Sequence, residues 1–390
     1  MIKHLIKLIW NKKRSNFLLT TEIFASFIVL FGVMSLMFYN YTNYSQPLGF
    51  EYENVWAIYF ERQDSPDSVY YPALERAKQF IAGHSEVEAV SFSSQNTPYS
   101  QSSMRWSASY EGKSVNSEME IVDEDYARTM GVQLEEGRWI EPAEVVGAQR
   151  VVVLNRQAKE ALFGDEPALG KMINFEEGEQ PWKVVGLTGN FKVKGEFQEP
   201  GPVIFRNHKA NNFPAETMLI KVKPSADAAF EASLLKDLSG IVKGTNTELS
   251  YLIDQRRTQH AFTKVPMIIA ATVCSFLLLN VGLGLFGVLW FNIRKRREEI
   301  GLRRALGATH TGILRHFVGE ALIIAAFGVV VGLFFALQLP LLDVFGLDKA
   351  IYFQAAIASV VLLLLLVALC ALYPSRQAAQ IQPAVVLHEE

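Results

Sequence analysis

Three short stretches of this sequence carry residue types that perform chemistry in enzymes, but their spacing does not suit that chemistry. Residues 164–172 resemble a phosphate-binding loop, yet the two glycines are one residue too far apart and Pro167 removes a backbone donor. The His-Ser-Glu run at 84–86 lacks the strand–turn–helix context of a nucleophile, and His310 and His316 do not share a helical face. We therefore expect a helix-to-strand turn at 164–172 and solvated surface at the other sites. We expect no catalytic, cofactor-binding or metal-binding residue on this chain.

The segment at 294–316 lies between two apolar stretches and carries seven Lys and Arg residues. A helix-forming sequence extends through Arg304, Gly307 breaks it, and Thr309 is placed to cap the helix that follows. Neither lipid nor the outer face of a membrane accepts so many positive charges at low cost. The segment is either a positive-inside anchor without a partner or a cytosolic surface that binds one.

Four apolar stretches are long enough to cross roughly 30 Å of hydrocarbon as helices, which takes about 20 residues each. They are residues 17–39, 265–293, 317–339 and 351–372. Lys and Arg crowd residues 3–14 as well as 294–316, so both segments should be cytosolic. The chain between the first two spans should then be extracytoplasmic, and both termini cytosolic.

The two ends of the chain fit this topology. Residues 1–16 have the pattern of a short amphipathic helix in the cytosolic interface, although they are also consistent with a frayed start of the first span. The first apolar run is too long for a cleaved signal peptide, so we interpret it as a retained anchor. Residues 373–390 form a cytosolic tail.

Charge divides the chain into two unlike parts. Residues 40–264 contain 23 Lys and Arg against 32 Asp and Glu, a net charge of −9, whereas the remainder carries +6. An acidic outer domain has no basic stripe to bind phosphates, which argues against nucleic acid as a partner. Both cysteines, Cys274 and Cys370, fall inside spans, so no disulfide framework is available.

The outer segment has the texture of an α+β domain. Alternating or β-rich runs predict strands at 55–60, 87–92, 150–154, 182–187, 202–205 and 218–222. Helical patterns occur at 72–81, 123–130, 155–163 and 226–238, and the polar residues of 93–103 predict an exposed loop. Residues 254–297 contain no turn cluster, so one helix should run from the domain through the second span.

Small and polar residues within the spans indicate helix packing. Gly328 and Gly332 form a Gly-x-x-x-Gly face in the third span, and Gly284 and Gly287 mark a second small face on the long helix. Spacing alone leaves open whether they pack within one chain or across a dimer. Asn280 lies near the middle of the second span, where an unpaired amide is costly, so we expect a helix–helix hydrogen bond there.

Two segments of the sequence resemble the FtsX-like permeases of the MacB type, an ABC transporter family. Residues 297–308 follow the family's R-x-x-E-I-G-x-R-x-A-x-G-A signature almost residue for residue, and residues 373–384 resemble its closing Y-P-A-R-x-A-A-x-x-x-P-A. Further matches lie at 137–138, 162–164 with 169–171, and 184–186. The resemblance implies four transmembrane helices, with a large extracytoplasmic α+β domain between the first two and an inserted lobe at about 124–200.

The resemblance also implies a function. Such a chain is the permease subunit of a mechanotransmission transporter in the bacterial cytoplasmic membrane, working with a second permease copy or a related permease. A separate ATPase subunit, which would bind ATP and Mg, docks under the cytosolic loop, and an extracytoplasmic adaptor is a further partner. The implied docking residues are Arg297, Glu298, Glu299, Ile300, Gly301, Arg303, Arg304, Ala305, Leu306, Gly307, Ala308 and Thr309. Export or efflux is the expected activity, and the alternative is a ligand sensor or a regulator of extracytoplasmic hydrolases.

Overall fold

The computed structural model describes residues 13–63, 65–175, 180–210 and 216–380. The chain divides into two compact units, an outer unit of residues 42–263 and a membrane unit of residues up to 41 and from 264 onward. The expected domain boundaries at 40 and 264 lie beside this division. Most of the interfacial helix expected at 1–16, and the tail beyond residue 380, lie outside the described residues.

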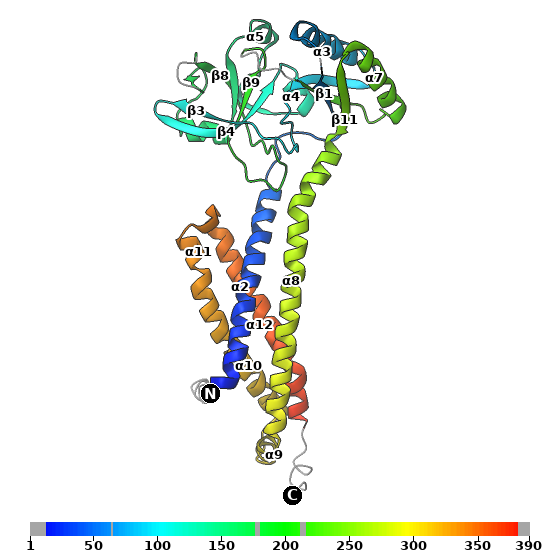
Figure 1. Cartoon of the computed structure of the whole chain (residues 1–390). Coiled ribbons are helices and arrows are strands. Elements are labelled where there is room, and N and C mark those ends of the chain that lie inside the picture. The colour runs from blue at the N-terminus through cyan, green and yellow to red at the C-terminus, as the bar shows by residue number, and fades with distance from the viewer. Residues whose placement is uncertain (1–12, 64, 176–179, 211–215, 381–390) are drawn as a thin grey trace. The chain divides into compact units, whose positions relative to one another are not determined.

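Four helices of the membrane unit are long and apolar enough to span a bilayer (Figure 1). They are α2 (Lys13–Tyr44), α8 (Leu252–Lys295), α10 (His310–Ala336) and α12 (Lys349–Ala379). Three short elements connect them, namely α9 (Arg297–Ala305), α11 (Gln338–Leu341) and the 3-10 turn η1 (Val344–Gly346). The predicted fold class, four spans with an α+β domain between the first and second, is confirmed.

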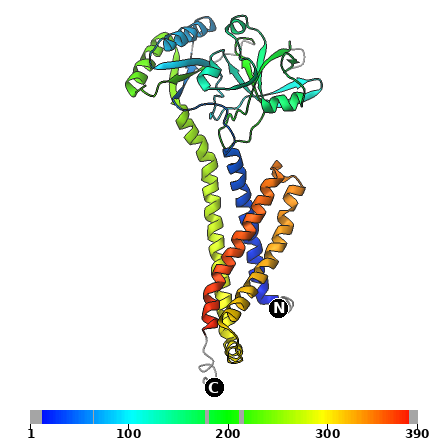
Figure 2. The ribbon, with the colours of Figure 1, turned by 180° about the vertical axis from the view of Figure 1, so that it is seen from behind.

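The spans share one apolar core. Leu19, Ile23 and Phe27 of α2 pack there with Leu285 of α8 and Ala325 of α10. Helices α10 and α12 run side by side in both views (Figure 2). In α8 only 22% of the most apolar window is buried, against 33% in each of the other spans, so much of its surface is left for lipid or a second chain.

The outer unit contains one mixed sheet. Its strands are β1 (Val55–Arg62), β2 (Val87–Ser93), β3 (Arg105–Tyr110), β4 (Lys113–Val122), β5 (Leu134–Gly137), β6 (Val151–Asn155), β7 (Met172–Ile173), β8 (Trp182–Thr188), β9 (Val203–Asn207), β10 (Thr217–Val222) and β11 (Thr245–Tyr251). The strand order is β11-β1-β10-β2-β4-β9-β6-β8-β5, with β3 paired to β4 and β7 to β8. The helices of this unit are α3 (Asp67–Ala82), α4 (Tyr126–Met130), α5 (Pro142–Val146), α6 (Arg156–Phe163) and α7 (Ala228–Ile241).

The sheet has two halves that meet between β2 and β4, where the strand register gives the single pair Ser93–Val122. In one half, α3 and α7 cover Trp56, Ile58 and Val90. In the other half, α6 packs over a core to which β3, β4, β6, β8 and β9 contribute. This second half starts earlier in the sequence than the lobe expected at 124–200, because it includes the β3–β4 hairpin.

All six predicted strands and all four predicted helices of the outer unit are present. The exposed loop predicted at 93–103 is only partly found, because residues 101–103 are exposed but most of residues 93–99 are buried. The Asn96 amide donates to the carbonyl of Met119 (2.8 Å) and to Glu120 (3.2 Å), and the Tyr99 ring packs against Phe50. Tertiary hydrogen bonds satisfy these polar groups, so composition alone misjudges their exposure.

The long helix predicted at 254–297 is present as α8, which continues without a break over 44 residues from Leu252 to Lys295. At 1.5 Å per residue this is roughly 66 Å of helix. Pro266 lies inside it without ending it. The helix stops at Arg296, just before α9.

Candidate functional site

The loop between α8 and α10 contains a short helix, α9, whose C-terminal end has a defined cap. Acidic Glu298 and Glu299 occupy the first turn of α9 and basic Arg303 and Arg304 the last, the arrangement that the helix dipole favours. Its end is a Schellman motif, in which Ala308 N–H donates to the carbonyl of Arg303 and Gly307 N–H to that of Arg304.

Two backbone features of the loop were predicted from the sequence and are found. Gly307 has a φ of +92°, a conformation that glycine adopts without the strain a side chain would bring. The hydroxyl of Thr309 then accepts a hydrogen bond from Gly312 N–H (3.1 Å) and caps α10. The break and the restart together fix the direction in which α9 leaves the membrane helices.

The inner face of α9 anchors it to three spans. Ile300 is 3% exposed and packs with Ile293 of α8, Ile313 and Phe317 of α10, and Ala378 of α12. Gly301 beside it is also buried. Arg296, the residue just before α9, forms an ion pair with Glu320 of α10 (3.2 Å), and both side chains are largely buried. The loop is therefore part of the packed membrane unit.

The outer face of α9 is exposed and mixed in character. Leu302 is 57% and Leu306 80% exposed, and the two are four residues apart on the same side of the helix. Glu299 and Arg303 form an exposed ion pair beside them. Of the other predicted docking residues, Arg297, Glu298, Ala305, Gly307 and Thr309 are exposed, while Arg304 and Ala308 are half-buried.

The two sequence signatures meet at a hollow of about 260 Å³. Arg294 lines it from the end of α8, Arg297 from the start of α9, and Pro374 and Gln377 from the end of α12. Trp290 of α8 completes one wall. The structure thus brings together residues more than 70 positions apart, on the side of the membrane unit that carries α9.

The glycines singled out in the spans differ in their surroundings. A Cβ built on Gly332 would overlap Cδ1 of Phe27, and one on Gly328 would stand 2.9 Å from Cγ2 of Ile23, so this face packs closely on α2. A Cβ on Gly284 would stand 3.0 Å from a carboxylate oxygen of Glu22, whereas a Cβ on Gly287 would meet no described atom within 4 Å.

The hydrogen bond expected from Asn280 is not made between helices of this chain. In the described structure Asn280 is exposed on α8, and its amide donates to the carbonyl of Phe276 on the same helix (2.8 Å). A carbonyl one turn earlier satisfies the amide locally, which removes the need for a neighbouring helix.

The stretch at 164–172 is the turn that the sequence predicts. Helix α6 ends at Phe163, Gly164 has a φ of +59°, and β7 begins at Met172. In the described ranges, no group of three or more His, Cys, Asp or Glu residues is placed to hold a metal ion. The absence of a cofactor on this chain stays a prediction.

A further cluster, missed in the sequence, lies in the outer unit where α8 begins. Glu196 accepts hydrogen bonds from Arg256 (2.5 Å) and Tyr99 (3.3 Å), and its carboxylate lies 2.7 Å from Nε2 of His260. Burial raises the pKa of Glu196, but the hydrogen bonds with His260 and Arg256 outweigh it and hold the pKa below its ordinary value. We call these four residues the Glu196 cluster.

The segment between β8 and β9, which contains Glu196, also holds the end of α2 that belongs to the outer unit. Lys192 donates to the carbonyl of Asn43, and the Asn43 amide donates to that of Phe197 (3.2 Å). Burial lowers the pKa of Lys192 to about 8, and the charge of Glu196 offsets only part of that. The polar residues at the end of α2 and the start of α8 were the only sequence signal for these contacts. Their partner, the segment around Glu196, lies about 60 residues before α8 in the sequence, so the pairing could not be predicted.

The fold defines a class, a multi-span membrane protein with an extracytoplasmic α+β domain between its first and second spans. Comparison with known families agrees with it in both units. Residues 24–236 match the MacB-like periplasmic core domain, and residues 271–383 match the FtsX-like permease C-terminal region. The chain therefore belongs to the MacB/FtsX-like family of ABC transporter permeases, which are not themselves catalytic.

Individual relatives are distant. The uncharacterized ABC transporter permease YvrN of Bacillus subtilis is 25% identical over 288 residues, 69% of each chain. The macrolide export ATP-binding/permease protein MacB of Aggregatibacter actinomycetemcomitans is 25% identical over 227 residues, which is 54% of this chain but 34% of that protein. The chain therefore spans about a third of the length of this MacB relative. The periplasmic region of MacB from Actinobacillus actinomycetemcomitans superposes with a TM-score of 0.40 at 16% identity, over 53% of this chain and 92% of that one.

Proposed function

We propose that this chain is the permease subunit of a mechanotransmission transporter, in which a separate ATPase subunit binds ATP and Mg and drives movement of the outer domain. A second copy or a related permease completes the assembly, and the termini and α9 lie on the cytosolic side. Export or efflux is the proposed outcome, with an extracytoplasmic adaptor as a further partner. The observation that carries the proposal is the exposed Leu302 and Leu306 pair on the anchored helix α9.

The chemistry of α9 suits a protein partner. Burying a leucine side chain contributes roughly 1.5–3 kcal/mol, and two exposed leucines on one helical face are a ready anchor for a groove. Exposed charges of both signs surround them, with Glu298 and Glu299 at one end and Arg303 at the other. Such a rim favours a partner with complementary charges.

The packing of α9 gives a route for force. A displacement of Ile300 bears directly on α8, α10 and α12, because all three contribute to its core. Helix α8 then continues without interruption to Leu252 in the outer unit. Pro266 removes one backbone hydrogen bond within α8, but the helix continues through it, so a displacement at one end is transmitted along its axis to the other.

Docking is tested by Leu306→Ser in the full chain, co-purified with a candidate ATP-binding cassette subunit. Leu341→Ser is the matched control, because Leu341 is 76% exposed and lies in α11, beyond the far end of α10. We expect Leu306→Ser to weaken ATPase binding about tenfold or more, since roughly 1.5 kcal/mol of burial is lost. Leu341→Ser should bind like the wild type. Equal binding by all three proteins would refute the docking surface.

A polar pocket in the outer unit favours the second candidate, a ligand sensor or a regulator of extracytoplasmic hydrolases. In that case ATP turnover by the partner should change with an outside ligand while no compound crosses the membrane. Transport assays in proteoliposomes that contain both subunits distinguish the two functions.

A further inference from the structure

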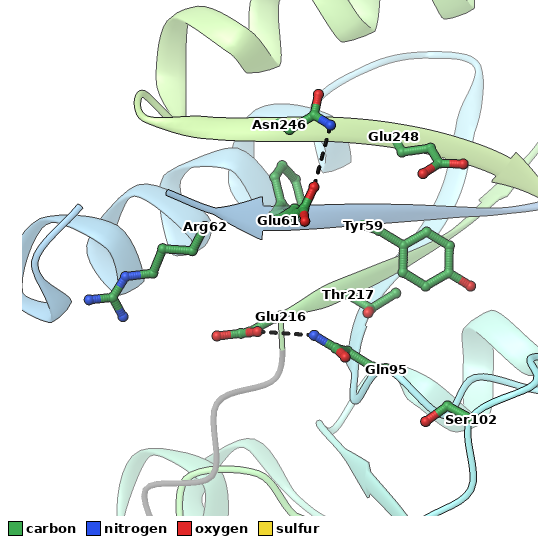
Figure 3. A pocket seen from close by; sticks show the side chains of 10 residues that line it. Tyr59, Glu61, Arg62, Gln95, Ser102, Glu216, Thr217, Asn246 and Glu248 are labelled. Carbon is green, nitrogen blue, oxygen red and sulfur yellow. Dashed lines mark hydrogen bonds between the residues drawn. The ribbon is translucent and has the colours of Figure 1, made fainter. Parts of the chain in front are cut away.

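A polar pocket of about 550 Å³ lies on one face of the sheet in the outer unit (Figure 3). Its polar lining side chains come from β1, β10 and β11, from the segment that follows β2, and from Glu216, the residue just before β10. This volume falls within the range of pockets that hold small organic molecules.

Strand register explains how the polar side chains converge. Tyr59 of β1 pairs with Glu248 of β11 on one side and with Thr217 of β10 on the other. Glu61 and Asn246 form the next row along β1 and β11. Cross-strand partners project from the same face of a sheet, so these five side chains form one wall.

The lining is acidic and its carboxylates are weakly engaged. Glu61, Glu216 and Glu248 contribute three negative charges. The amides of Asn246 and Gln95 approach Glu61 and Glu216 at 3.5 and 3.3 Å, at the long limit for a hydrogen bond (Figure 3).

The one cationic residue of the lining is engaged elsewhere. The Arg62 guanidinium forms an ion pair with Asp67 (2.6 Å) and donates to the carbonyl of Ser65 (2.6 Å). In the described structure it therefore acts on Glu216 only through its charge and leaves the hydrogen-bonding capacity of the three carboxylates to a ligand.

A second observation is independent of charge. Thr217 is fully buried, lines the pocket, and its hydroxyl has no hydrogen-bond partner in the described part of the chain. An unsatisfied buried hydroxyl costs roughly 1–3 kcal/mol. Its neighbour Tyr59, by contrast, is held by Thr97 and Gln255, each at 2.9 Å. The Thr217 hydroxyl can therefore accept a hydrogen bond from a donor placed in the pocket.

We propose that this pocket binds a small organic cation with primary ammonium groups, which donate to Glu216, Glu248 and the Thr217 hydroxyl. An ammonium carries three donors and matches a lining of carboxylates and hydroxyls. A bare metal ion fits less well, since the three carboxylates do not form a metal-binding group in the described residues. The net charge of −9 on residues 40–264 attracts such a ligand toward the domain.

The test is calorimetric titration of spermidine into the full chain in nanodiscs of neutral lipid. Spermidine should bind saturably. Glu248→Gln should weaken binding about tenfold, and Glu53→Gln, at an exposed carboxylate outside the pocket, should leave it unchanged. Thr217→Val should weaken binding while leaving the protein as stable as the wild type or more so, because it removes an unsatisfied hydroxyl.

Three results would overturn the proposal. One is equal spermidine binding by the wild type, Glu248→Gln and Thr217→Val. Another is an equal loss in Glu53→Gln and Glu248→Gln, which would show diffuse attraction to an acidic surface. The third is displacement of spermidine by stoichiometric Ca²⁺, which would make the pocket a metal site.

Discussion

The Glu196 cluster offers a quantitative test of how the segment between β8 and β9 holds the start of α8. The perturbation is Glu196→Gln, which keeps the size and one acceptor oxygen of the side chain but removes its charge. Arg256 and His260 lie in the first turns of α8, so the change acts on residues 252–263 of that helix.

The expected magnitude follows from the contacts. The Glu196 side chain is 10% exposed, Arg256 19% and His260 8%, so the charge-assisted hydrogen bonds are only partly screened by water. Each such bond contributes about 1.5–3 kcal/mol. Arg256 keeps its contact with the Tyr52 ring, 4.6 Å from the centroid, and the glutamine keeps one weaker bond. We expect the local opening free energy of this part of α8 to fall by about 2 kcal/mol, which is roughly 30-fold faster amide exchange.

Hydrogen exchange measured by mass spectrometry on the full chain in nanodiscs reads this directly. Glu199→Gln is the matched control, because Glu199 is an exposed carboxylate on the same loop. The reasoning fails if residues 252–263 exchange alike in the wild type and both variants. It also fails if Glu196→Gln speeds exchange uniformly across the outer sheet, since the cluster would then be a global stability element.

Two further predictions concern packing and pH. Gly332→Leu should prevent the protein from folding into a monodisperse species, because the new Cβ would overlap Phe27. Gly287→Leu has open space around its Cβ and should purify normally. Size-exclusion chromatography in detergent compares the two variants. Burial beside Phe92, with smaller contributions from Lys209 and Lys78, lowers the pKa of His208 to about 3, so below pH 6.5 the unfolded chain binds a proton that the folded chain does not. The stability of the wild type relative to His208→Phe should therefore fall by about 1 kcal/mol between pH 6.5 and 5.5 in urea unfolding; an unchanged difference between the two proteins would contradict this assignment.

Local signals in the sequence predicted much of this fold. The β-branched runs of β6 and β8, the four apolar spans and the caps around Gly307 and Thr309 depend on neighbours within a few residues. The docking residues were predicted as one surface, but the structure turns Ile300 and Gly301 inward, which a motif without helical phase does not show.

What the sequence did not show depends on distant partners. The β3–β4 hairpin carries Glu118 and Glu120 among serines and looks like solvated surface, yet both carboxylates are buried. Glu120 receives its hydrogen bond from Asn96, 24 residues earlier. Burial raises the pKa of Glu120 well above its ordinary value, and the nearby charge of Glu118 raises it further. Such pairings are set by topology, which composition and periodicity do not encode.

The fit of α10 on α2 constrains how the membrane helices are able to move. Sliding one of these two helices by a single residue would bring a side chain where Gly332 now faces Phe27, so the pair has one permitted register. Helix α8 has no such lock at Gly287 and is the least enclosed of the four. If a helix of this unit moves along its axis, the packing leaves more freedom to α8 than to the closely fitted pair α2 and α10.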